Sequence, residues 1–136
     1  AKDDFIYAVG DFSGTVDFGQ IKKESLNQND RDPFLGKLDA NWNWQWVSSG
    51  GGFSDDYGYE VTVDENGNSY MLGTYQGIAT FDSTSLLNDG GFDTFVAKAD
   101  SGGTWEWAIR TSVNTVEEYS HMIYNSGLLH LGLKVR

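Results

Sequence analysis

Two pairs of adjacent carboxylates are the residues whose types best suit acid–base chemistry. Asp55-Asp56 and Glu117-Glu118 lie about sixty residues apart. Paired carboxylates act as general acid and base in many hydrolases, including glycosidases. Side chains that are neighbours along an extended chain point to opposite sides, however. A pair that recurs at a fixed spacing favours a structural role, so the sequence predicts no catalytic residue and no enzyme.

A second candidate chemistry is metal binding. The run Asp64-Glu65-Asn66-Gly67-Asn68 offers oxygen atoms at alternate positions, as calcium loops do. It lacks the bidentate glutamate that such loops carry downstream, and Asn-Gly is a typical hairpin turn. His121 and His130 have no cysteine or third histidine to complete a zinc site, and no Ser-His-Asp order stands out. The sequence therefore predicts no metal site and no cofactor site.

Five tryptophans are the third candidate, because aromatic faces suit the apolar faces of sugar rings. Four of them recur at a fixed spacing, which favours a packing role. Trp42 aligns instead with Gly103 in a predicted turn, where we expect an exposed side chain. Trp42 is therefore the candidate ligand-contact residue, with local packing as the alternative. The four recurring residues are Trp44, Trp46, Trp105 and Trp107.

An internal repeat positions these residues. The segment 32–46 aligns with 93–107 at a constant offset of 61 residues, and 6–19 aligns with 69–82 at an offset of 63. A weaker third copy aligns 116–123 with 54–61, and 128–132 with 69–73. Self-similarity at a fixed period indicates a repeat architecture. We expect one segment, 1–136, with units at approximately 1–53, 54–115 and 116–136, the last incomplete.

Each complete unit is predicted to contain four strands. Residues 59–64 alternate apolar and polar side chains, 65–68 form a tight turn, and 69–75 return. A longer loop through 83–91 leads to strand 94–100, and a turn leads to strand 104–109. A period of two places Trp44 with Trp46 on one face, and likewise Trp105 with Trp107. The fold class is thus all-β, with four-stranded antiparallel blades of a β-propeller that stack face to face.

Two lysines also match between the units. Lys37 lies beside Asp39, and Lys98 lies beside Asp100. We expect cross-strand ion pairs at these positions.

Several motifs resemble a known family. The run "DTFVAKAD" at 93–100 and the run "WEWA" at 105–108 resemble the SBBP repeat of seven-bladed β-propellers, whose units read D-x-F-V-A-K-x-D and W-x-W-A. Segments 56–59, 63–70 and 10–14 are similar to the same family, and the resemblance fades after Val113. It implies propeller blades in a large secreted or cell-surface protein, and no particular reaction.

The predicted strands do not make a whole ring. The chain begins at the second strand of a unit and contains nine strands, about two blades and a degenerate third. A ring takes about four to eight blades. The chain is therefore expected either to be a segment of a longer propeller or to associate with identical chains, as a homo-oligomer or a filament. The uneven ends favour the segment.

The composition limits the classes of partner and the cellular locations that are expected. A formal net charge of −11 excludes general affinity for nucleic acid or anionic lipid. It suits an extracellular or cell-surface location and permits cation binding. The absence of cysteine leaves the redox compartment open. No stretch reaches the roughly 20 apolar residues that insert into a membrane.

Three functions remain from the sequence. The favoured one is a non-enzymatic structural and interaction module of a secreted or cell-surface protein, whose partners are other blades and a protein ligand. The alternative is a carbohydrate-binding, lectin-like propeller that uses Trp42. A propeller hydrolase or lyase is the least favoured, because no polar constellation interrupts the repeat.

Overall fold

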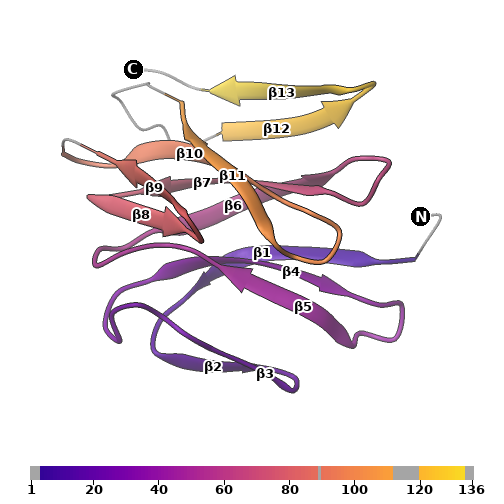
Figure 1. Cartoon of the computed structure of the whole chain (residues 1–136), viewed down its shortest axis with the longest axis horizontal. Coiled ribbons are helices and arrows are strands. Elements are labelled where there is room, and N and C mark those ends of the chain that lie inside the picture. The colour runs from indigo at the N-terminus through magenta and orange to yellow at the C-terminus, as the bar shows by residue number, and fades with distance from the viewer. Residues whose placement is uncertain (1–3, 89, 112–119, 134–136) are drawn as a thin grey trace.

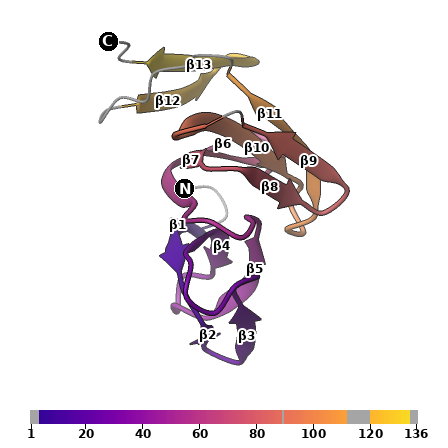
Figure 2. The ribbon, with the colours of Figure 1, turned by 90° about the vertical axis from the view of Figure 1, so that its left-hand side faces the viewer.

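The computed structural model describes residues 4–88, 90–111 and 120–133. These residues form strands and turns, and no helix among them could cross a bilayer. Three antiparallel sheets lie face to face, one above another (Figure 1, Figure 2). The all-β fold with propeller-like blades is confirmed, and the sheets form an open stack.

The middle sheet is a complete four-stranded blade. Its strand order is β11-β10-β7-β6, so each strand pairs with a neighbour that follows or precedes it in the unit. The hairpin turn at Asp64–Asn68 and the turn at Asp100–Thr104 lie where the sequence predicts them. The strands are β6 (Tyr57–Val63), β7 (Ser69–Tyr75), β10 (Asp93–Ala99) and β11 (Trp105–Arg110).

The flanking sheets are smaller. The first blade has the order β1-β4-β5, and the last sheet is a two-stranded ribbon, β12-β13. With the middle blade they account for the nine predicted strands. Their bounds are β1 (Ile6–Phe12), β4 (Asp32–Leu38), β5 (Trp44–Ser49), β12 (Ser120–Asn125) and β13 (Leu128–Leu133).

Two additional hairpins were not expected. The segment 83–91 was predicted to be a loop, but it contains β9 (Thr84–Leu87), which pairs with β8 (Ile78–Phe81) just before it. The first blade carries the matching pair β2 (Thr15–Phe18) and β3 (Ile21–Glu24). Phe81 is 1 % exposed, and its ring centroid lies 4.8 Å from that of Phe95 on β10. The hairpin forms because it covers apolar surface that the four-stranded sheet would otherwise expose.

The hydrophobic core lies between the sheets. One cluster joins Leu35 of the first blade to Met71 and Phe95 of the second, all fully buried. Another joins Leu72 and Val96 of the second blade to the ribbon. Tyr70 stacks on Tyr124 across that second interface, with ring centroids 5.9 Å apart. Burial between neighbouring sheets therefore holds the stack together.

A bulge reverses one prediction about the tryptophans. Trp107 pairs with Lys98, and Trp105 pairs with Ala99. One step along β10 therefore corresponds to two residues on β11, which is a β-bulge. The two rings therefore lie on opposite faces. Trp105 packs with the cluster towards the first blade, and Trp107 packs with the cluster towards the ribbon. The prediction that they share a face was wrong.

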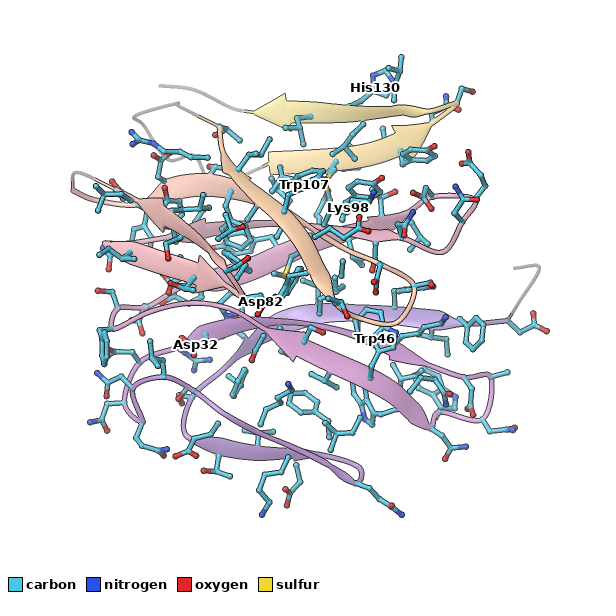
Figure 3. All side chains as sticks on the ribbon, in the orientation of Figure 1. Asp32, Trp46, Asp82, Lys98, Trp107 and His130 are labelled. Carbon is cyan, nitrogen blue, oxygen red and sulfur yellow. The ribbon has the colours of Figure 1, made fainter. Side chains whose placement is uncertain are left out.

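The first blade repeats this geometry. The register of β5 against β4 shifts between Lys37 and Leu38, so Trp44 and Trp46 also separate. Trp44 lies 5.1 Å from Phe18 on the hairpin of its own blade, measured between ring centroids. Trp46 reaches the next blade, where its Nε1 donates a hydrogen bond of 3.1 Å to the Ser101 carbonyl. Figure 3 shows Trp46 and Trp107 at the two successive interfaces.

The ribbon differs from the sequence alignment by one residue. Alignment of 54–61 with 116–123 places Ile123 at the position of Val61, which faces the preceding blade. In the structure Met122 faces the preceding blade and is 4 % exposed, whereas Ile123 is 50 % exposed. A shift of one residue in a strand exchanges its faces. The part of the alignment at 116–119 lies outside the described residues.

Gly103 provides a test of the contact between blades. Its φ is +87°, and a β-carbon there would lie 2.6 Å from Cδ2 of Trp46. We expect Gly103→Ala to lower the free energy of unfolding by about 2 to 4 kcal/mol, because left-handed strain adds to overpacking. Urea denaturation measures the loss. Gly127→Ala is the control, since Gly127 has φ +84° but no atom within 4 Å of its β-carbon position. An equal loss in both variants would contradict the role of the Trp46 contact.

Candidate functional site

The adjacent carboxylates Asp55 and Asp56 have separate structural tasks. Asp56 is fully buried, and its two oxygens accept hydrogen bonds from the backbone N–H groups of Gly52 (2.9 Å) and Gln76 (3.0 Å). Asp55 Oδ1 accepts a hydrogen bond of 2.9 Å from the backbone N–H of Arg31 in the first blade. The side chains thus join different segments. Their predicted counterparts, Glu117 and Glu118, lie outside the described residues.

A different pair of carboxylates does come together. Asp32 begins β4, and both Asp32 and Asp56 face Gly51: a β-carbon at Gly51 would collide with Asp32 Oδ1 and lie 3.1 Å from Asp56 Oδ2. The pKa of Asp56 is raised to about 7, mainly by burial and in part by the negative charge of Asp32, and burial raises the pKa of Asp32 to about 6. The sequence analysis missed this pair, since the two residues lie in different units.

The predicted calcium-like loop is a turn stabilised by its own aspartate. Asp64 Oδ1 accepts hydrogen bonds from the backbone N–H groups of Asn66 (2.9 Å) and Asn68 (3.0 Å). Oδ2 accepts from Asn68 Nδ2 and from the Tyr70 hydroxyl. Burial raises the pKa of Asp64, but these hydrogen bonds outweigh it and hold the pKa below its usual value. The carboxylate is committed to the turn.

The same turn occurs twice more. Asp39 Oδ1 accepts from the N–H groups of Asn41 and Asn43, and Asp100 Oδ1 accepts from those of Gly102 and Thr104. Asp39 and Asp100 therefore hold their turns, and the predicted cross-strand ion pair of Lys98 forms with a residue of β11. Lys98 Nζ lies 2.9 Å from Glu106 Oε2. Lys37 lies over the Phe5 ring, with its Nζ 3.8 Å from the centroid.

Trp42 occupies the third inner position of the first of these turns. Its side chain is 70 % exposed, as expected, and its φ is +66°. Glycines fill the matching position in the other two turns, Gly67 with φ +80° and Gly103 with φ +87°. A bulky residue in the left-handed region is strained by roughly 1 to 2 kcal/mol. The strain marks Trp42 as unusual, and an exposed indole is free to make contacts.

Two neighbouring cavities lie where the first and second blades meet. One, of about 310 Å³, is lined by Lys23, Ser48, Ser49, Asp82, Gly103, Thr104 and Trp105. The other, of about 240 Å³, is lined by Glu24, Leu26, Asp32, Ser49, Gly50, Gly51 and Thr80. Ser49 belongs to both, and neither is lined by Trp42. Figure 3 shows Asp32 and Asp82 on the two sides of this junction.

The histidines do not meet at a site. His121 Nδ1 lies 3.1 Å from Glu60 Oε1, and His130 points away from the stack on the outer side of the ribbon (Figure 3). Across residues 4–88, 90–111 and 120–133, no group of three or more histidine or acidic side chains is arranged to hold a metal ion. The polar side chains at the two cavities are carboxylates, hydroxyl groups of serine and threonine, and Lys23, and the exposed indole of Trp42 lies outside both cavities.

One segment of the chain matches a known family. Residues 50–74 match the family model described as a β-propeller repeat, SBBP. This segment covers Gly51, Asp56, β6 and the turn at Asp64, up to Thr74 on β7. No curated protein matches the chain. Together with the stacked sheets, the match identifies residues 50–74 as a β-propeller repeat of the SBBP family within a chain built of antiparallel blades.

Proposed function

We propose that this chain is a non-enzymatic structural and interaction module whose outer faces stack against further blades. The supporting observation is the outer face of the ribbon. Ile123 is 50 % exposed and Leu128 is 63 % exposed, and both lie on the face opposite Met122. The interfaces on the inner side are apolar sheet-to-sheet contacts, and these two side chains give the outer face, which also carries His130, the apolar groups that one more contact of the same kind needs. Its occupant is another blade, of the same protein or of an identical chain.

The hydrogen bonds that the acidic residues accept also support a non-catalytic role. Asp56 and Asp64 accept hydrogen bonds from backbone N–H groups, and such carboxylates hold segments in place. A general base needs a lone pair directed at a substrate. The net charge of −11 suits a secreted or cell-surface setting.

The stacking proposal is tested by the association state. We expect the mass from light scattering to rise with protein concentration, because blade faces associate. The double variant Ile123→Lys, Leu128→Lys should remain monomeric at the same concentrations, since two charges would be buried at the interface. The control is Ile78→Lys, a residue 55 % exposed on the β8–β9 hairpin. A monomer at every concentration, with native circular dichroism, contradicts the proposal.

A second function, carbohydrate binding, is favoured by Trp42 alone. A strained and exposed residue that persists where glycine fits suggests a function for its side chain. Asn41 precedes it, and its amide suits the hydroxyl groups of a sugar, whereas the amide nitrogens of Asn43 and Gln45 donate to Asp39 Oδ2 and leave their amide oxygens to accept from a sugar. An indole face stacked on a sugar ring and flanked by amides is an arrangement suited to a lectin-like contact.

Trp42→Gly separates the two roles of this residue. We expect the variant to gain roughly 1 kcal/mol in free energy of unfolding, because glycine removes the left-handed strain. Glycan-array binding should be lost if Trp42 contacts sugars. Trp42→Phe is the control, since it keeps an aromatic face and the strain. Equal glycan signals from wild type and Trp42→Gly, or no signal from wild type, contradict the lectin-like role.

A further inference from the structure

The second blade contains an arginine paired with a buried aspartate, and the first blade lacks this arginine. Arg110, the last residue of β11, pairs through Nε with Asp93 Oδ2, the first residue of β10. Arg110 Nη1 also donates a hydrogen bond of 3.2 Å to the Leu87 carbonyl. The Asp93 side chain is 3 % exposed. The guanidinium thus neutralises a buried carboxylate and satisfies a carbonyl at the end of β9.

The first blade keeps the carboxylate and loses the arginine. Asp32 begins β4 as Asp93 begins β10, and Ser49 ends β5 as Arg110 ends β11. Ser49 pairs with Phe34 in the same way that Arg110 pairs with Phe95. The residue at the Leu87 position is Glu24, because the hairpin β2–β3 matches the hairpin β8–β9 at an offset of 63, so that Glu24 ends β3 as Leu87 ends β9. All three positions correspond, and the cation has been replaced.

The carboxylate left in the first blade is incompletely satisfied. Asp32 is 4 % exposed, and its Oδ2 accepts a hydrogen bond of 2.7 Å from the Leu26 N–H. Its Oδ1 is buried with no hydrogen-bond partner among the described residues. Burial raises the pKa of Asp32 to about 6, so the group is still mainly ionised at neutral pH. A buried charge without a counter-charge is costly, and a bound cation would lower that cost.

A cavity lies where the guanidinium would fit. Asp32, Ser49 and Glu24, the three corresponding residues, all line the 240 Å³ cavity. This volume is several times the roughly 30 Å³ that a water molecule occupies. Glu24 adds a second carboxylate to the lining, and Gly50 and Gly51 contribute no side chains to fill it. Size and charge therefore both suit a cationic group.

We propose that this cavity, the Asp32 pocket, binds the guanidinium group of an arginine side chain from another polypeptide segment. The guanidinium would lie as that of Arg110 lies in the second blade, with one edge towards the Asp32 carboxylate and one N–H towards the Glu24 carbonyl. A guanidinium fits better than an ammonium because its planar, forked donors serve a carboxylate and a carbonyl together. The inference is independent of the stacking proposal, since the ribbon is not involved.

The test is isothermal titration calorimetry, in which arginine compounds are added to the whole chain near neutral pH. We expect the peptide Gly-Gly-Arg-Gly-Gly to bind at one site, with a Kd of roughly millimolar or tighter. Gly-Gly-Lys-Gly-Gly should bind about tenfold more weakly, because an ammonium lacks the fork. Methylguanidinium is the third probe. Weaker binding of methylguanidinium than of the arginine peptide shows that the peptide contributes, and equal binding of the two overturns the assignment to a polypeptide arginine.

Variants make the assignment specific. Ser49→Arg supplies a tethered guanidinium, so it should abolish binding and raise the melting temperature. Ser83→Arg adds the same charge at an exposed turn and should leave binding intact. Asp32→Asn should abolish binding without filling the pocket. Arg110→Ser should create a second site and raise the stoichiometry. The absence of saturable binding in wild type, binding unchanged in Ser49→Arg, or tighter binding of Ca²⁺ displacing the peptide would overturn the proposal.

Discussion

Phe95→Ala is expected to lower the free energy of unfolding by about 3 to 5 kcal/mol, which is a large part of the total for a domain of this size. Phe95 is fully buried on the central strand β10. Its ring lies 4.8 Å from Phe81 and 6.2 Å from Tyr75, between centroids, so truncation leaves a cavity among large side chains. Urea denaturation followed by tryptophan fluorescence measures the loss.

The hydrophobic cluster around Phe95 joins the two blades, so Phe95→Ala should destabilise both of them. Leu35 of the first blade belongs to the cluster of Phe95. We expect one cooperative transition shifted as a whole. Phe53→Ala is the matched control, because Phe53 is 74 % exposed and its truncation should change stability by less than about 0.5 kcal/mol. Similar losses in the two variants would contradict the central position of Phe95.

The second large effect is a dependence of stability on pH. Burial raises the pKa of Asp32 to about 6 and that of Asp56 to about 7, above the value of 3.8 for an ordinary aspartate. Backbone N–H groups of Leu26, Gln76 and Gly52 lower these values in part, and neighbouring acids raise them. Both groups therefore hold protons in the folded state that they release in the unfolded state.

The sign follows from proton binding. Between about pH 4 and pH 7 the folded state binds more protons than the unfolded state, so stability falls as pH rises. The stabilisation from the two protonated carboxyl groups is fully present below about pH 4. It is lost as the pH rises through about 6 for Asp32 and about 7 for Asp56. The expected loss across this range is on the order of 3 kcal/mol for Asp32 and 4 kcal/mol for Asp56, since their pKa values are raised by about 2 and 3 units and one unit corresponds to about 1.4 kcal/mol. Urea midpoints at both ends of the range measure it.

Variants distinguish this pair from other titrating groups. Asp32→Asn removes one buried charge, so its urea midpoint should change less with pH than that of wild type. Asp17→Asn is the control, because Asp17 is exposed and pairs with Lys22 at the surface. If Asp32→Asn and wild type show the same pH slope, the raised pKa of Asp32 is contradicted.

The sequence predicted the regular parts of the fold and missed the irregular ones. Alternation over 59–64 and the Asn66-Gly67 turn located β6 and β7, because strand period and turn chemistry agree there. The hairpin 78–87 was missed because each of its strands has only four residues. The bulge at Lys98 was missed because one added residue changes no composition and no repeat length.

The candidate site was predictable only in part. Exposure of Trp42 followed from its lack of a tryptophan counterpart in the second unit. The Asp32 pocket left a signal as well, since Ser49 stands where the aligned unit has Arg110. The burial of Asp56 left none, because it depends on the close approach of Gly51 and Gly52 to its carboxylate.

The bulge in the last strand of each blade has a consequence for how such a protein grows in evolution. It directs one of two nearby tryptophans towards the preceding blade and the other towards the following blade. Each unit therefore carries both of the surfaces that form a contact between blades. Duplication of one unit in the gene then produces a blade that already fits both neighbours, without a compensating substitution. Copy number can rise or fall by whole units, and the rotation from one blade to the next decides where the ring closes.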